Sequence, residues 1–169
     1  VVTNFYIINN TCYKNDLDTS LGNVGSFTTQ GSHTGYFINN ITFAAASNNP
    51  SYDQEGSNSN VQYFADMYFG APNNFSYSDP TQLINANPLF VNAPSESIGA
   101  YGTSLPPSLL GTGLTLSPLS PALGKGLDPS TLAGLPSAIV SDLKLYIYVD
   151  INGTARPQGG GVDLGAYQH

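Results

Sequence analysis

An internal repeat constrains the fold of this chain more than any other feature of its sequence. Residues 6–13 (YIINNTCY) and 36–43 (YFINNITF) align without a gap at an offset of 30 residues, and both contain an Asn-Asn pair. A looser third copy, residues 63–70 (YFADMYFG), follows at an offset of 27, and this alignment puts Asp66 in the place of Asn39. A period of this length is typical of solenoids, in which each copy supplies one coil of the chain.

The Asn pair lies between two short runs of apolar and β-branched residues, which favour strands. Asn tolerates the left-handed backbone conformation that a sharp bend requires, and its amide can bond to the Asn of the next copy. The sequence therefore predicts stacked strand–bend–strand units joined by amide ladders. The residues with this structural role are Asn9, Asn10, Asn39 and Asn40.

The composition indicates a packed β-protein and excludes several classes of function. Hydrophobic residues make up 40% of the chain and charged residues only 9%, against roughly 25% charged in an average soluble domain. The net charge is −7 with four basic residues, so no basic patch for nucleic acid or an anionic membrane can form. The chain contains no run of ~18 apolar residues, so no membrane span is predicted. The single Cys12 is expected to be a small buried residue rather than a reactive thiol.

The C-terminal half has a different character from the repeats. Pro and Gly recur every few residues between residues 92 and 136, so long regular strands or helices are not expected there. No long helical periodicity occurs in the chain, which predicts an all-β protein. We expect a single domain over residues 1–169, with repeated coils in 1–92 and an irregular wrap with closing strands in 93–169. Within the wrap, the expected elements are a short helix or turn at 137–145 and strands at 146–151 and 162–167.

Three motifs in the C-terminal third point to a known family. They are NPLF at residues 87–90, SPALGKG at 120–126, and the series Asp150, Gly153, Arg156-Pro157, Asp163 and Gly165-Ala166-Tyr167. In this order they resemble the D-P-L-F, S-P-A-I-D-A-G and D-x-x-G-x-x-R-P…D-x-G-A-x-E blocks that end right-handed parallel β-helix proteins of the pectate-lyase-like superfamily. The departures are Asn87 for Asp, Leu123 for Ile, Gly124-Lys125 for Asp-Ala, and Gln168 for Glu.

The resemblance implies an all-β, right-handed parallel β-helix that forms the C-terminal portion of a longer secreted or cell-surface protein. Relatives include polysaccharide lyases, glycoside hydrolases and adhesins, so it is more specific for fold than for function. Two functions stay open. One is a carbohydrate-associated protein, with or without turnover, whose partner is a polysaccharide or glycan. The other is a structural or adhesive extracellular protein that assembles head-to-tail into filaments through its open N-terminal end.

Candidate catalytic residues are few. Glycoside hydrolysis needs two facing carboxyl groups ~5–9.5 Å apart, and a lyase needs a base beside several carboxylates. The candidates are Asp16, Asp18, Asp66 and Lys14. A solvated loop is the alternative for Asp16 and Asp18, which could also donate oxygens to Ca²⁺. A place in the amide ladder is the alternative for Asp66.

Candidate sugar contacts come from a polar loop and from aromatic side chains. Tyr52, Asp53 and Glu55 lie in a segment rich in Asn and Ser, which suits carbohydrate binding. Other tyrosines can either stack on sugar rings or fill the core; these are Tyr13, Tyr63, Tyr68 and Tyr77. Glycosylation sequons begin at Asn9, Asn40, Asn74 and Asn152 and permit a eukaryotic secretory origin.

Arg156 is the only arginine, and Asp150 and Asp163 flank it at a spacing compatible with turns. A buried guanidinium that bridges two carboxylates would lock the last strands together through its fixed fork of donors. The alternative is a lyase arginine that neutralises a uronate. Because Arg156 belongs to the terminal motif, we expect the structural role.

Overall fold

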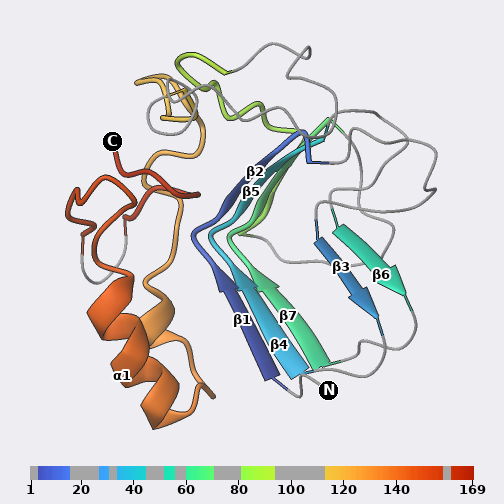
Figure 1. The fold of residues 1–169 in the computed structure, drawn as a ribbon, viewed down its shortest axis with the longest axis vertical. Coiled ribbons are helices and arrows are strands. Elements are labelled where there is room, and N and C mark those ends of the chain that lie inside the picture. Colours follow the sequence, from blue (N-terminus) through green and yellow to red (C-terminus); the bar gives the residue numbers. More distant parts are fainter. Residues whose placement is uncertain are drawn as a thin grey trace, which may run out of the picture.

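The computed structural model describes residues 4–15, 27–30, 34–44, 52–55, 60–70, 81–93, 113–157 and 161–169. Its repeats form two parallel sheets, and the chain bends sharply from one sheet to the other within each repeat (Figure 1). The first sheet contains β1 (Asn4–Ile8), β4 (Thr34–Ile38) and β7 (Asn60–Phe64), in that order. The second contains β2 (Thr11–Tyr13), β5 (Ile41–Phe43), β8 (Met67–Phe69) and β9 (Leu83–Ile84).

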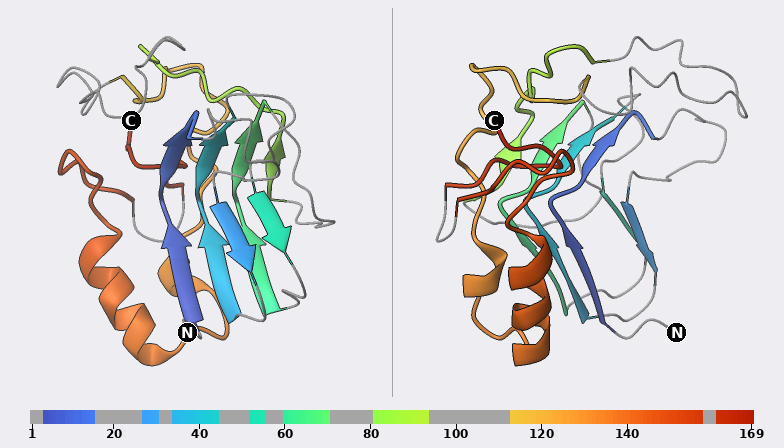
Figure 2. Two further views of the ribbon diagram at one scale, coloured as in Figure 1. Left: turned by 45° about the vertical axis from the view of Figure 1, so that its right-hand side comes forward. Right: turned by 60° about the vertical axis from the view of Figure 1, so that its left-hand side comes forward.

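A third, two-stranded parallel pair lies across from the first sheet. It consists of β3 (Phe27–Gln30) and β6 (Tyr52–Glu55), and it stands on the side of the sheet opposite to the C-terminal helix (Figures 1 and 2). The repeats therefore have an inner face toward β3 and β6 and an outer face toward the C-terminal segment, whose described residues are 113–157 and 161–169.

The strand register agrees with the sequence alignment for the first two copies and corrects it for the third. Tyr6 pairs with Tyr36, as the offset of 30 requires. Tyr63 pairs with Phe37 rather than with Tyr36. A slip of one residue moves every side chain of a strand to the other face, and the observed register keeps Tyr63 buried in the same cluster as Phe37. Asp66 consequently takes the place of Asn40, not of Asn39 as the sequence alignment had placed it.

The bend in each repeat uses a left-handed residue at one fixed position. Asn9, Asn39 and Ala65 occupy it with φ angles of 56°, 59° and 51°. Asn adopts this conformation more readily than other residues with a side chain, whereas Ala pays a steric cost for it. The third copy therefore keeps the bend without the residue that favours it.

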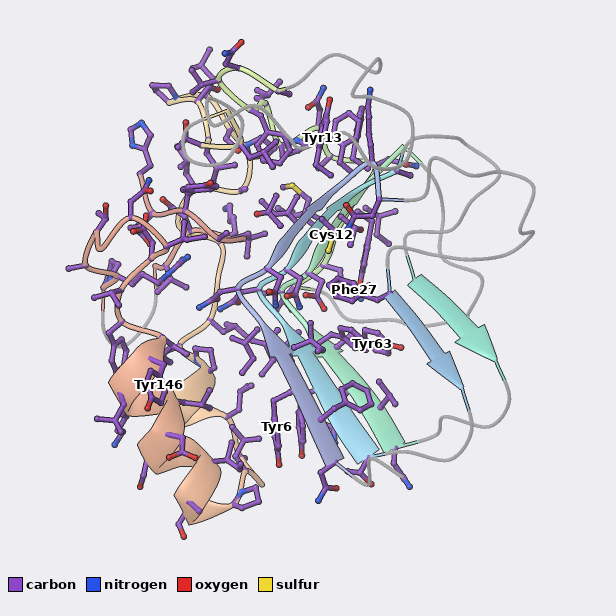
Figure 3. All side chains as sticks on the ribbon, in the orientation of Figure 1. Tyr6, Cys12, Tyr13, Phe27, Tyr63 and Tyr146 are labelled. Atoms are coloured by element: carbon purple, nitrogen blue, oxygen red, sulfur yellow. The ribbon has the colours of Figure 1, made fainter. Side chains whose placement is uncertain are left out.

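Two separate cores hold the molecule together. The inner core contains Phe37, Val61, Tyr63 and Tyr68, with Phe27 packed against it, and Figure 3 shows Tyr63 and Phe27 in the space between the first sheet and β3. The outer core joins the second sheet to the C-terminal segment. Its buried members are Ile41, Ala65, Met67, Leu116, Ala122 and Leu164.

The C-terminal segment contains a short 3₁₀ helix, η3 (Pro129–Thr131), and one α-helix, α1 (Ser137–Tyr146). Helix α1 follows Pro136 and buries Leu143, while Ile147 at its C-terminal end is also buried. Their spacing of four residues places both on one face of the helix. Helix α1 therefore extends to Tyr146 with Ile147 as its C-cap, and Val149 makes only an isolated bridge with Ala155, so the strand expected at 146–151 does not form.

The prediction of an all-β right-handed parallel β-helix is wrong. The described residues form two small parallel sheets, the β3–β6 pair and a ten-residue α-helix, which is a mixed α/β arrangement rather than a long solenoid. The second expected closing strand is also absent, because Val162 makes only an isolated bridge with Gly126. The physical reason is the change of sequence after β9, where Pro and Gly replace the strand–bend–strand pattern.

Candidate functional site

The first repeat has an exposed edge. Among the described residues, β1 pairs only with β4 and β2 pairs only with β5, so no described strand lies on the opposite side of either. The backbone donors and acceptors on such an edge are a template for pairing with another chain. Natural proteins commonly protect these edges with charged residues or Pro. Residues 4–13 (NFYIINNTCY) contain neither.

A directional amide ladder runs from the core to this edge. The backbone N and the Nδ2 of Asn40 donate to Asp66 Oδ1 at 2.7 and 2.9 Å. The same two groups of Asn10 donate to Asn40 Oδ1 at 3.0 and 3.2 Å. Each member thus donates toward the C-terminal repeat and accepts from the N-terminal one. Asn10 Oδ1, the last acceptor, receives no hydrogen bond from any described residue.

The neighbouring Asn residues connect the repeats to the C-terminal segment. Asn39 Nδ2 donates to Asn9 Oδ1 at 3.1 Å and to Leu127 O at 2.7 Å, and Leu127 N donates to Asn39 Oδ1 at 2.8 Å. Gly165 N donates to Asn39 O at 2.7 Å. Asn39 is fully buried, so these contacts replace all of its contacts with water.

Aromatic rings form rows that also end at the edge. Tyr6 stacks on Tyr36 with the ring centroids 5.4 Å apart and an interplanar angle of 2°. Tyr13 packs against Phe43 at 4.8 Å. The ammonium of Lys14 lies 5.3 Å from the centre of the Tyr13 ring, which is a cation–π contact. Among the described residues, Tyr6 is the last ring of its row, and Tyr13 also packs edge-on against Phe90 with the ring centroids 5.8 Å apart.

The opposite end of the second sheet carries a short continuation of the repeat. Strand β9 pairs with β8, so that Leu83 lies opposite Met67 and Ile84 opposite Tyr68. Leu83 N donates to Asp66 O at 2.9 Å, and Ala65 N donates to Thr81 Oγ1 at 2.9 Å. Ile84 is 62% exposed although it continues a row whose inner members are buried.

The single arginine has the structural surroundings expected of it but not the expected partners. Arg156 is buried, and its Nη1 and Nη2 donate to the backbone carbonyl oxygens of Asp163 and Gly165 at 3.0 and 2.7 Å. The interpretation that the guanidinium bridges two carboxylates is therefore wrong in its contacts. The Nε of Arg156 donates to no described residue.

The two aspartates accept backbone hydrogen bonds instead. Asp150 Oδ1 accepts from the N–H groups of Asn152 and Thr154 at 2.8 and 2.7 Å, and its Oδ2 accepts from Gln168 N at 3.0 Å. Asp163 accepts from Gly124 N at 2.7 Å and from His169 N at 2.6 Å. Each of the four carboxylate oxygens thus accepts at least one backbone hydrogen bond, which fits a role in holding the turns together.

The charges of this cluster shift the pKa values of its members. Desolvation by burial opposes ionisation of Asp150, but the three backbone N–H groups and the Arg156 charge outweigh it and lower the pKa of Asp150. Desolvation lowers the pKa of Arg156, and the negative charges of Asp150 and Asp163 partly offset this. The cluster is a buried, mutually dependent set of charges.

The candidate catalytic residues do not come together in the described part of the chain. Asp66 is fully buried in the amide ladder, and Asp16 and Asp18 lie outside the described residues. The described residues contain no group of three or more His, Cys, Asp or Glu side chains able to hold a metal ion, so the Ca²⁺ site at Asp16 and Asp18 stays a prediction.

The candidate sugar contacts have different outcomes. Tyr63 and Tyr68 are buried at 3% and 1% exposure and belong to the core, so they cannot stack on a sugar. Tyr52, Asp53 and Glu55 lie in β6, where Asp53 pairs with Thr28 and Glu55 with Gln30. Tyr77 lies outside the described residues.

The sequons also differ in accessibility. Asn40 is fully buried, so its amide has no room for a glycan in this fold. Asn9 is half-buried and hydrogen-bonded to Asn39, whereas Asn152 is exposed. Asn74 lies outside the described residues. Asn152 is thus the sequon that this fold leaves most accessible among those described.

Cys12 is half-buried, and desolvation raises the pKa of its thiol to about 11, partly countered by a hydrogen bond with Asn15. At neutral pH the thiol is protonated and weakly nucleophilic. Figure 3 shows Cys12 on the second sheet.

Comparisons with known proteins add no relative. No family model, no curated protein and no solved structure matches this chain. Among the described residues, no helix has the length and apolar character needed to cross a bilayer.

The sequence predicted an open N-terminal end but did not identify the strands β1 and β2 as its edge. The signal that could have found it is the uncharged, Pro-free run at residues 4–13, next to a repeat whose amides all point the same way.

Proposed function

We propose that the protein is a structural or adhesive module of the cell exterior that assembles with copies of itself through the edge of β1 and β2. The observation that carries this proposal is the amide ladder, which ends at the edge with Asn10 Oδ1, an acceptor that no described residue uses. Strand addition at such an edge supplies affinity through main-chain hydrogen bonds and specificity through side chains. The absence of charge in residues 4–13 removes the usual barrier to it.

Sedimentation velocity across a range of concentrations tests the assembly. We expect weight-average mass to rise with concentration for the unaltered chain. An Asn10→Lys variant should stay monomeric, because it places a long charged side chain on the exposed edge and removes the ladder acceptor. Asn10 is exposed, so this substitution disturbs the edge more than the core.

Asn152→Lys is the matched control, because it makes the same change of charge at an exposed turn of the C-terminal segment. It should assemble like the unaltered chain. A monomer at every concentration, or equal assembly of the two variants, would contradict the proposal.

A second candidate is polysaccharide binding at the β3–β6 pair. Strand register places Asp53 and Glu55 of β6 opposite Thr28 and Gln30 of β3, so four polar residues occupy alternate positions of one small sheet. Affinity electrophoresis in gels that contain acidic or neutral polysaccharides should retard the chain, and an Asp53→Ala/Glu55→Ala variant should migrate freely. Equal migration of both with every polysaccharide would exclude this candidate.

A further inference from the structure

We infer that the partner of the β1–β2 edge is a second copy of this chain, which docks the segment Thr81–Ile84 onto residues Asn9–Cys12 in parallel register. This inference rests on the proposed assembly and specifies which surfaces meet. Both segments (TQLI and NNTC) are uncharged, and they occupy the same positions of the repeat at opposite ends of the second sheet.

The backbone hydrogen bonds between neighbouring strands of the second sheet define how one repeat stacks on the next. Ile41 N donates to Asn10 O and Met67 N donates to Asn40 O, both at 2.8 Å. Leu83 N donates to Asp66 O at 2.9 Å, so the short segment before β9 follows the same rule. Gln82 is therefore the fourth member of the series that begins with Asn10.

The two ends are complementary when this rule is extended to a second copy. The N–H of Gln82 donates to no described residue, and Asn10 Oδ1 accepts from none. In the ladder, the backbone N–H of each member donates to the side-chain oxygen of the next. Docking thus brings Gln82 N of one copy to Asn10 Oδ1 of the other, and Thr11 N to the carbonyl oxygen of Gln82.

Apolar contact supports the same register. The row Cys12, Thr42, Tyr68 and Ile84 runs across the sheet, with each residue paired to the next. Thr42 and Tyr68 are buried, but Ile84 at the end of the row is 62% exposed. Head-to-tail docking covers Ile84 of one copy with Cys12 of the next. A contact of two different surfaces that does not close on itself generates a filament.

Pairing of two identical edges is less favourable. If two β1–β2 edges met, Asn10 Oδ1 of each copy would face the β1–β2 edge of the other copy. That edge offers no side-chain donor along the direction of the ladder. The head-to-tail arrangement sets a donor against an acceptor instead. The polarity of the ladder therefore selects the second copy's Thr81–Ile84 segment over its β1–β2 edge.

Disulfide trapping tests the register with the native thiol. Aligned residues on neighbouring strands lie ~4.8 Å apart, within the Cα separation that a disulfide allows. Within one chain Cys12 and Ile84 are three strand spacings apart, ~14 Å, so in the Ile84→Cys variant a disulfide between Cys12 and the introduced thiol must join two copies. We expect this variant, oxidised with copper phenanthroline at pH 8.5, to give a ladder of covalent oligomers on a non-reducing gel.

Two controls make the result specific. Leu83→Cys moves the thiol to the other face of β9 and should give no species larger than a dimer. Cys12→Ser in the Ile84→Cys background should also stop at dimers, since only one thiol remains. The burial of Cys12 slows its reaction equally in the Ile84→Cys and Leu83→Cys variants.

The outcomes separate this inference from the proposed function. Concentration-dependent assembly together with a covalent ladder supports both. The Ile84→Cys variant could assemble in sedimentation and yet give no covalent species larger than a dimer on the non-reducing gel. That result would overturn the register but leave the assembly standing. A monomer in sedimentation would overturn both.

Discussion

The repeats and the C-terminal segment satisfy their backbones in different ways. In the repeats, strands pair in register and like residues lie above one another, as Tyr6 does with Tyr36 and Asn10 with Asn40. The described residues of the C-terminal segment form isolated bridges and no strands. Individual side chains such as Asp150 and Arg156 bond to several backbone groups each.

This difference predicts that single substitutions change the free energy of unfolding by different amounts in the two regions. A repeated arrangement divides its stability among many similar contacts, and each is worth about 1 kcal/mol. The C-terminal segment concentrates its contacts in a few buried charged groups, and the loss of one such group leaves its partners unsatisfied at a cost of several kcal/mol. The predictions below test this contrast, beginning with the largest expected effect.

Replacement of Arg156 should be the most damaging change. Arg156→Leu removes the donors to the carbonyl oxygens of Asp163 and Gly165 and leaves two nearby buried carboxylates without a compensating charge. Breaking a buried charged network in this way costs about 4 kcal/mol. Urea denaturation followed by circular dichroism measures the free energy of unfolding. Lys144→Leu is the control, because Lys144 is exposed on α1 and should change stability by less than about 0.5 kcal/mol. Similar losses for both variants would refute the concentrated role of Arg156.

Gly165 tests the contact between the two regions. Its φ is +80°, and a Cβ there would overlap Thr11 Oγ1 and lie 2.9 Å from Ile41 Cδ1, both in the repeats. Gly165→Ala should therefore cost about 3 kcal/mol, from left-handed strain and overpacking together. Gly153 has a similar φ of +83° with nothing within 4 Å of a Cβ.

Gly153→Ala should cost only about 1 kcal/mol, because it adds the strain without the overlap. If the unfolding free energies of the two variants fall with the same slope against urea concentration, the difference between their urea midpoints measures the docking of the C-terminal segment on the repeats. If the two midpoints coincide, the close contact of Gly165 with Thr11 and Ile41 that the structure shows would be refuted.

Much of the repeat region was predictable because its information is local and recurs. The gapless alignment of residues 6–13 with 36–43 agrees with the observed pairing, and the Asn pairs lie at the bends. The third copy was misaligned by one residue because Tyr63 matched Tyr36 by identity. Burial decides the register, and burial depends on Phe37 and Val61 from different parts of the chain.

The C-terminal segment was harder to predict because its partners are distant in sequence and act through the backbone. Ala166 N donates to Thr11 Oγ1 across 155 residues, and Leu127 bonds to Asn39 across 88. Residues 146–151 were expected to form a strand, but Tyr146 ends α1, Ile147 is its buried C-cap, and only an isolated bridge forms at Val149. The C-terminal sequence motif led us to expect a structural role for Arg156, yet its hydrogen bonds go to carbonyl oxygens that no side-chain pattern reveals.

Asp150 should make the C-terminal segment sensitive to acid. Its pKa in the folded state is lowered, so its contribution to stability is fully present above the unfolded pKa of about 3.9 and is lost as pH falls through the folded value. Asp150→Asn keeps one acceptor oxygen and loses the charge, which should cost about 2 kcal/mol at pH 7. Urea midpoints between pH 6 and pH 2 should fall less steeply for the variant. Parallel curves for the two proteins would show that Asp150 titrates alike in the folded and unfolded chains.

The smallest expected effect lies in the repeats and has the opposite sign. Ala65 holds the bend of the third copy at φ 51°, where the first two copies have Asn. Ala65→Gly relieves about 1–2 kcal/mol of left-handed strain, which offsets the lost buried methyl group and the added freedom of the unfolded backbone, so we expect a net change between zero and a gain of about 0.5 kcal/mol.

Ala44→Gly is the matched control for this gain, because Ala44 is also buried but its φ is not positive. It loses a methyl group and gains backbone freedom without relief of strain, so it should destabilise by about 1 kcal/mol. Differential scanning calorimetry should thus show the melting temperature unchanged or raised for Ala65→Gly and lowered for Ala44→Gly. A loss of stability in both would mean that packing around Ala65, and not the bend, limits the third repeat. The repeats would then resemble the C-terminal segment in depending on single well-packed positions.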